Sequence, residues 1–91
     1  MLSNKEIKRK EIFKKTQELI KVTRDFKKAQ SDLLLALNDC AQAEVCHYNK
    51  LQKGVVELRF KGAVKHYFRV YGQKMIIEEH IQELKNWKAE D

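Results

Sequence analysis

Five residues of this 91-residue chain are cysteines or histidines, which can bind metals or take part in nucleophilic catalysis. Metal ligands must converge, and the sequence contains neither C-x-x-C nor H-E-x-x-H spacing. Adjacent residues on a helix point about 100° apart, so a helical Cys-His pair diverges. A buried cysteine behaves as a small hydrophobe, and a histidine at an apolar heptad position is usually a core polar residue. We therefore predict structural roles and no bound metal for Cys40, Cys46, His47, His66 and His80.

Groupings that would support catalysis are also weak. A nucleophile pair of Cys46 and His66 has no glycine-containing elbow or oxyanion loop beside it. The acids Glu78, Glu79 and Glu83 are expected to pair with neighbouring polar side chains along a helix. The sequence contains no glycine-rich phosphate loop. These observations predict a protein that is not an enzyme and uses no cofactor.

The positive charge of the chain is concentrated in its first third. The formal net charge is +6, and residues 1–30 hold ten Lys or Arg against four acids. Such a basic segment is an electrostatic docking surface for an anionic partner, although a solvated lysine-rich helix face is the alternative interpretation. Nucleic acid is the less favoured partner, because base-stacking aromatics are not interleaved with the charges. The residues expected to make the contact are Lys8, Arg9, Lys10, Lys14, Lys15, Lys21, Arg24, Lys27 and Lys28.

These groups must be positioned by long helices, because helix-breaking residues are scarce. The chain has no proline, and its first glycine is Gly54. Residues 1–53 therefore permit one helix of up to roughly 80 Å. Ser3 and Glu6 match a capping box that begins this helix near Asn4. Residues 2–10 precede the apolar pattern and are expected to fray or extend freely.

A seven-residue apolar repeat predicts a coiled-coil seam along the first helix. The repeat runs from Ile12 to about Ala43 and fades over residues 47–53, where the helix is expected to break or bend. Four further apolar residues widen the stripe, which favours a bundle over a bare two-stranded coil. The repeat consists of Ile12, Leu19, Phe26, Leu33, Cys40 and His47, interleaved with Val22, Ala29, Ala36 and Ala43, and Ile20, Leu34, Leu35 and Leu37 widen it.

Gly54 predicts a helix end followed by a turn, which places the turn region near residues 53–62. Val56, Leu58 and Phe60 alternate with charged residues as in a strand, but no second strand exists to pair with them. Helix or irregular turn is therefore favoured over strand. From Phe60 the seven-residue pattern resumes, interrupted only by Lys74, and beside it lies a second apolar set of Val64, Phe68, Tyr71 and Met75.

Two such helices predict a single all-α domain over residues 1–91, an elongated helical hairpin or coiled-coil bundle. The second helix is apolar over much of its circumference between Phe60 and Ile77, so one partner helix leaves part of it exposed. We expect self-association, as a homodimer, or packing against another helical protein. The residues expected to carry assembly are Leu19, Phe26, Leu33, Phe60, Tyr67, Phe68, Tyr71, Ile77, Ile81 and Leu84.

The second half of the chain has an aromatic-rich pattern of Glu57-Leu58-Arg59-Phe60, Phe68-Arg69 and Tyr71, closed by Ile81, Leu84 and Trp87. Over residues 44–88 this pattern resembles the terminal helices of BAR domains, particularly those of sorting nexins. The resemblance implies a crescent-shaped dimer of long helices that places basic residues on a curved, acidic membrane.

The sequence thus predicts a helical interaction module that oligomerises and docks on an acidic partner, for which a membrane surface is one candidate. The alternative is a small basic nucleic-acid-binding protein, or a regulatory or inhibitory helical protein that acts on a protein partner. Two cysteines make no disulfide framework, which favours a cytoplasmic location, peripheral to membranes if the partner is lipid. No apolar run approaches the roughly 18 residues of a membrane-spanning helix.

Overall fold

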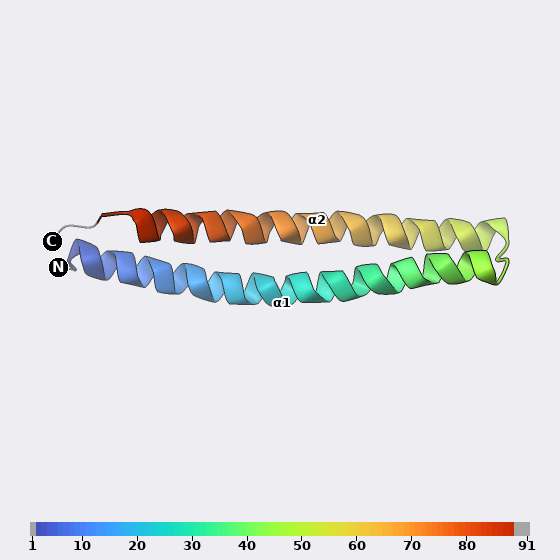
Figure 1. The fold of residues 1–91 in the computed structure, drawn as a ribbon, viewed down its shortest axis with the longest axis horizontal. Coiled ribbons are helices and arrows are strands. Elements are labelled where there is room, and N and C mark those ends of the chain that lie inside the picture. The colour runs from blue at the N-terminus through green and yellow to red at the C-terminus, as the bar shows by residue number, and fades with distance from the viewer. Residues whose placement is uncertain (1, 89–91) are drawn as a thin grey trace.

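The computed structural model describes residues 2–88, which form two long antiparallel helices (Figure 1). Helix α1 spans Asn4–Val45 and helix α2 spans Lys50–Asn86. The helices lie side by side in a rod of 68 × 17 × 15 Å. The first turn of α1 and the last turn of α2 lie at the same end of this rod, called here the open end (Figure 1). The predicted all-α helical hairpin is confirmed.

Helix α1 begins where the sequence predicts. Ser3 is its N-cap, and the Ser3 hydroxyl oxygen accepts a hydrogen bond of 3.2 Å from the backbone N–H of Glu6. This bond satisfies one of the N–H groups that a helix start leaves without an intrahelical partner. The Glu6 carboxylate lies in the first turn, where the helix dipole favours a negative charge.

The seam between the helices combines small side chains on α1 with branched side chains on α2. The alanines of α1 follow the predicted seven-residue spacing, and their small size lets the backbones approach closely. Only this one stripe of each helix is covered, since a hairpin has a single internal interface. The buried apolar residues of the described chain are Ala29, Ala36, Ala43, Val56, Val70 and Ile81.

An aromatic cluster fills the middle of the seam. The ring of Phe26 lies 5.2 Å from that of Tyr67 and 5.8 Å from that of Tyr71, measured between centroids. Lys74, which interrupts the apolar pattern, lies with its Nζ atom 5.7 Å from the centroid of the Phe26 ring. The same Nζ atom lies 2.6 Å from Oε1 of Glu78. The charge of Lys74 therefore lies over the face of the Phe26 ring, where a cation is favoured, and is also paired with a carboxylate.

The turn lies earlier in the chain than predicted. Residues 46–49 connect the helices, and the prediction of a turn near 53–62 is wrong because that segment lies inside α2. His47 adopts a left-handed φ of 54°, and the backbone N–H of Tyr48 donates a 3.0 Å hydrogen bond to the carbonyl of Ala43. This is the six-to-one bond of a Schellman helix end. The first helix is expected to break or bend within residues 47–53. It ends at Val45 and α2 begins at Lys50, so the break lies slightly earlier than predicted, and residues 50–53 are already helical.

A capping box begins α2 ahead of Gly54. The Asn49 side chain accepts from the backbone N–H of Gln52 at 2.9 Å, and the Gln52 side chain accepts from the backbone N–H of Asn49 at 3.1 Å. Gly54 has a negative φ, so its conformational freedom is not used. Val56 is buried and Leu58 is exposed, because residues two apart lie about 200° apart around a helix. The preference for helix over strand in this segment is confirmed.

Replacing His47 with glycine should raise the free energy of unfolding by about 1 kcal/mol, because glycine adopts a left-handed φ without the Cβ clash. Urea denaturation followed by circular dichroism measures this change. His47→Ala is the matched control, since alanine keeps the Cβ and should give no gain. A glycine variant no more stable than the alanine variant would contradict a left-handed His47.

Replacing Gly62 or Gly72 with alanine should raise the free energy of unfolding by roughly 0.5–1 kcal/mol each. Both glycines lie within α2, and a Cβ added at either position meets no atom within 4 Å. The gain comes from reduced backbone freedom in the unfolded chain. Thermal denaturation measures the effect, and Ala41→Gly on the exposed surface of α1 should show a loss of similar size. A destabilised Gly72→Ala protein would indicate a close neighbour at this point of the helix.

Candidate interaction surfaces

Most residues predicted to carry assembly are used in the fold of the single chain. Phe68 and Tyr71 are the exceptions, with 63% and 42% of their surface exposed. Phe68 nevertheless contacts the cluster, since its ring lies 5.6 Å from that of Tyr67 in an edge-on arrangement. The other eight are buried or half-buried: Leu19, Phe26, Leu33, Phe60, Tyr67, Ile77, Ile81 and Leu84.

The seam divides the hairpin into two broad sides that differ in chemistry. Because the helices are antiparallel, an approximate two-fold rotation relates them. Residues at the same position of the seven-residue repeat therefore lie on the same side of the hairpin in both helices. Two shallow grooves show this division. One has a volume of about 560 Å³ and is lined by Lys27, Gln30, Ser31, Leu33, Leu34 and Tyr67. The other has a volume of about 430 Å³ and is lined by Asp25, Lys28, Asp32, His66, Arg69, Val70 and Gln73.

The first side carries large exposed apolar residues from both helices. On α1 these residues are spaced seven residues from Lys27 or Gln30, which line the first groove, so they lie on the same side of the helix as that groove. On α2 each of them directly follows a residue of the seam. At these positions of the seven-residue repeat, residues 20–37 and 64–75 contain one charged residue, Lys27. We call this surface the apolar face. Its large members, each 42–66% exposed, are Ile20, Leu34, Leu37, Phe68, Tyr71 and Met75.

The opposite side carries polar and charged residues and is called here the polar face. Every seventh residue of α1 from Glu11 to Asp39 is acidic, and the facing row of α2 holds arginine, histidine and glutamine. Sequence reasoning missed this feature, although the spacing was visible in the chain. The two rows are Glu11, Glu18, Asp25, Asp32 and Asp39 on α1, and Arg59, His66, Gln73 and His80 on α2.

Two of the nine residues predicted to contact an anionic partner, Lys8 and Lys15, are held by contacts within the chain. The Nζ atom of Lys15 is paired with Oε2 of Glu18 at 3.3 Å, and Lys8 is turned toward the end of α2. The remaining seven are exposed on the outer side of α1, away from the seam, because 100° per residue places them within an arc of about 140°. They are Arg9, Lys10, Lys14, Lys21, Arg24, Lys27 and Lys28. The first two thirds of α1 therefore carry a basic outer face.

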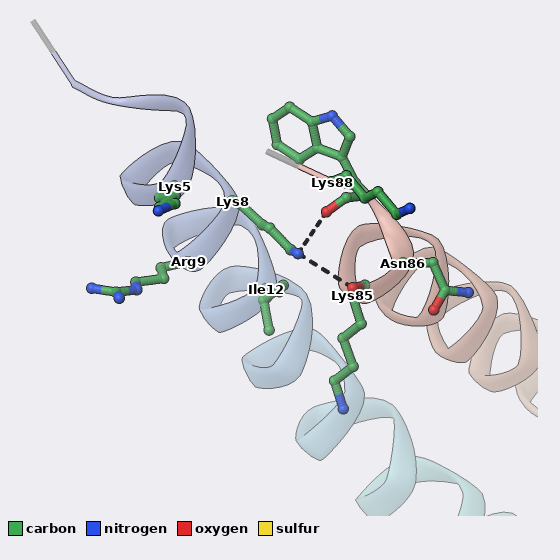
Figure 2. Close-up of a pocket in the computed structure, with 8 residues that line it drawn as sticks. Lys5, Lys8, Arg9, Ile12, Lys85, Asn86 and Lys88 are labelled. Carbon is green, nitrogen blue, oxygen red and sulfur yellow. Dashed lines mark hydrogen bonds between the residues drawn. The ribbon is translucent and has the colours of Figure 1, made fainter. Parts of the chain in front are cut away.

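Basic residues from both helices converge at the open end of the hairpin. The Nζ atom of Lys8 donates hydrogen bonds to the carbonyl oxygens of Lys85, at 3.2 Å, and Trp87, at 2.6 Å (Figure 2). The expectation that residues 2–10 extend freely is therefore wrong, because Lys8 holds the last carbonyls of α2. A pocket of about 620 Å³ surrounds this contact, and we call it the open-end pocket. It is lined by Lys5, Lys8, Arg9, Ile12, Lys85, Asn86, Trp87 and Lys88.

The residues that could bind a metal or act as nucleophiles remain dispersed. Within residues 2–88, no three His, Cys, Asp or Glu side chains gather in a way that could hold a metal ion. Cys40 is half-buried at a seam position, and Cys46 is exposed in the connection between the helices. His66 lies roughly 24 Å along α2 from the start of that helix, which separates it from Cys46. The structure thus does not bring together the pair that sequence reasoning considered.

Comparisons with known proteins add no relative from which a function could be transferred. No family model matches the chain, and no curated protein or solved structure matches it significantly. The resemblance to BAR-domain helices therefore stays an expectation from the residues alone. Between residues 2 and 88, neither helix has a stretch that is long and apolar enough to cross a membrane.

Replacing Lys8 with methionine should loosen the last turn of α2. Methionine keeps the apolar stem but removes the ammonium group that binds the Lys85 and Trp87 carbonyls. An exposed charge-assisted bond of about 1 kcal/mol corresponds to roughly fivefold faster amide hydrogen exchange in that turn. Lys10→Met, at an exposed position on the same helix, is the control and should leave the exchange unchanged. Equal exchange in all three proteins would show that Lys8 does not hold the end of α2.

Proposed function

We propose that this chain is a non-enzymatic helical interaction module that self-associates through its apolar face and presents its basic residues to an acidic partner. The apolar face is the observation that carries the proposal. Six large side chains from two helices lie on one side of the rod, and over residues 20–37 and 64–75 their rows contain the single charge of Lys27. A contiguous apolar surface of this kind on a soluble helical rod is typical of a protein interface.

The exposed area of the hairpin supports a need for a partner. A compact monomer of 10.8 kDa exposes roughly 5,500 Å² of accessible surface. This chain exposes 7375 Å². The excess reflects the rod shape, in which each helix covers only one stripe of the other. Packing a further helical layer on the apolar face would give the chain the second interface that a bundle requires.

A second copy of the chain fits the apolar face in size and composition. Six large side chains with on the order of 100 Å² exposed each give about 600 Å² per copy, or about 1,200 Å² in a pair, which is the lower end for a stable interface. A two-fold pair places the same patch on both sides, so apolar residues meet apolar residues. Lys27 keeps its charge in water at the edge by extending its methylene stem.

The proposal includes a cytoplasmic location. Cys40 and Cys46 are both free, and Cys46 is exposed in the connection between the helices. A reducing compartment keeps such an exposed thiol from forming a disulfide between chains. The protein would be peripheral to a membrane if its acidic partner is a lipid surface.

Light scattering coupled to size exclusion tests self-association. The unchanged protein should elute with twice the mass of one chain. The double variant Leu34→Gln and Phe68→Gln should dissociate at least about tenfold more readily, because it buries two amide groups without partners. Both residues are exposed within the single chain, so the helical content measured by circular dichroism should not change.

Lys65→Gln is the matched control, since Lys65 is exposed on α2 three residues before Phe68 and outside the apolar rows. It should keep the mass of the unchanged protein. An unchanged protein that is monomeric at all concentrations up to its solubility limit would overturn self-association. Binding of a nucleic-acid duplex or single strand, with a steep loss of affinity as salt rises, would favour the alternative function instead.

A further inference from the structure

We propose that the open-end pocket is a docking site for an anionic membrane surface, which the hairpin meets end-on. This inference deepens the acidic-partner part of the proposed function and names its site. Neither helix forms the site alone. It is assembled where the first turns of α1 meet the last turn of α2, and Figure 2 shows lysines from both helices around the Lys8 contact.

The open end concentrates positive charge more strongly than the other end of the rod. Residues 2–12 and 85–88 contain six Lys or Arg and two acids. Residues 44–53, at the connection between the helices, contain Lys50, Lys53 and Glu44, and Lys53 Nζ lies 3.6 Å from Glu44 Oε1. Glu90 and Asp91 follow in the sequence beyond the described residues, so the test below uses the full chain. A negatively charged surface is attracted to the open end first.

The helix termini strengthen this polarity. The start of α1 carries the partial positive charge of a helix dipole, and the end of α2 carries the partial negative charge. Lys8 donates to the carbonyl oxygens of Lys85 and Trp87, so the negative end of α2 is neutralised by a lysine from the other helix. The face that remains for a ligand is cationic. Lys8 is thus a positioning residue, while the side chains of Arg9, Lys85 and Lys88 are exposed around the pocket.

Exposed apolar side chains at the same end favour a membrane over nucleic acid. Leu2, Ile7 and Trp87 are 46%, 39% and 41% exposed among the basic residues. Tryptophan lies preferentially at the headgroup level of a bilayer, where its ring is partly apolar and partly hydrated. A phosphate backbone attracts the lysines equally well but offers no apolar layer for Leu2 and Ile7. Basic residues together with insertable apolar residues are the usual composition of an interfacial anchor.

Sedimentation with vesicles tests the proposal. The vesicles contain either phosphatidylcholine alone or phosphatidylcholine with phosphatidylserine, and the unchanged protein should bind only the second kind. Each basic residue close to an acidic surface strengthens binding about fivefold. The open-end variant K5Q/R9Q/K85Q/K88Q should therefore bind these vesicles on the order of a hundredfold to a thousandfold more weakly. It retains Lys8, so the contact between the helix ends stays in place.

The variant K21Q/K28Q/K61Q/K65Q is the matched control, because it removes the same charge from exposed positions in the middle of the rod. These residues lie at least roughly 18 Å along the axis from Arg9 or Lys85, beyond the screening length of about 8–10 Å at physiological salt. The control should therefore bind within about twofold of the unchanged protein. Equal losses in the two variants would show that the rod lies flat or binds through net charge, and would overturn the proposal.

The fluorescence of Trp87 gives a second readout, since it is the one tryptophan of the chain. Its emission should shift to shorter wavelength on acidic vesicles and become protected from iodide quenching. Vesicle binding without this shift would overturn the end-on geometry. Tight binding of a single-stranded oligonucleotide, together with no vesicle binding, would overturn the membrane as partner.

The same vesicles also separate this proposal from self-association. The variant L34Q/F68Q alters the apolar face and leaves the open end unchanged. If it is monomeric and still sediments with acidic vesicles, both surfaces act as proposed. If the unchanged protein is monomeric and binds vesicles through the open end, only the proposal of self-association is contradicted. If it is a dimer that does not bind acidic vesicles, only the proposal of the open-end site is contradicted.

Discussion

The structure depends on one constraint, which is that two helices share a single seam. Each helix covers only one stripe of the other, and the alanines of α1 make that stripe narrow. Close backbone approach fixes which residues face inward, while Phe26 and Tyr67 fill the middle with their rings. Everything apolar outside the stripe must remain on the surface. The apolar face, the polar face and the open end are therefore consequences of how little a two-helix seam can bury.

The heptad pattern was sufficient to predict the two helices and their antiparallel pairing. It could not predict the turn, because Gly54 is a stronger sequence signal than the residues that form it. The connection uses a histidine in a left-handed conformation and the capping box of Asn49 and Gln52, and only the second was readable from residue types. The pattern also identified apolar stripes without showing which stripe meets which helix. For this reason eight of ten predicted assembly residues are buried or half-buried in the fold, while Phe68 and Tyr71 contact the aromatic cluster and still keep 63% and 42% of their surface exposed.

The surfaces of the hairpin point in different directions, so they do not compete for space. The apolar face lies along one side of the rod, and the open-end pocket lies at its tip. A second copy packed along the side would leave the tip accessible. The polar face has acids on α1 opposite arginine and histidines on α2, so burying it in an interface would cost the hydration of these groups. The many lysines of α1 obscured this division in the sequence, because a net charge does not show on which side of the helix each lysine lies.

The position of both helix ends at one end of the rod has a mechanical consequence (Figure 1). A force that pulls the start of α1 away from the end of α2 acts across the seam, so it loads one turn at a time. The bonds from Lys8 to the carbonyls of α2 carry part of that load. Opposed forces along the rod axis would instead have to slide the whole seam at once. The hairpin is thus compliant to peeling and stiff to shear, and a layer packed on its side would resist the peeling.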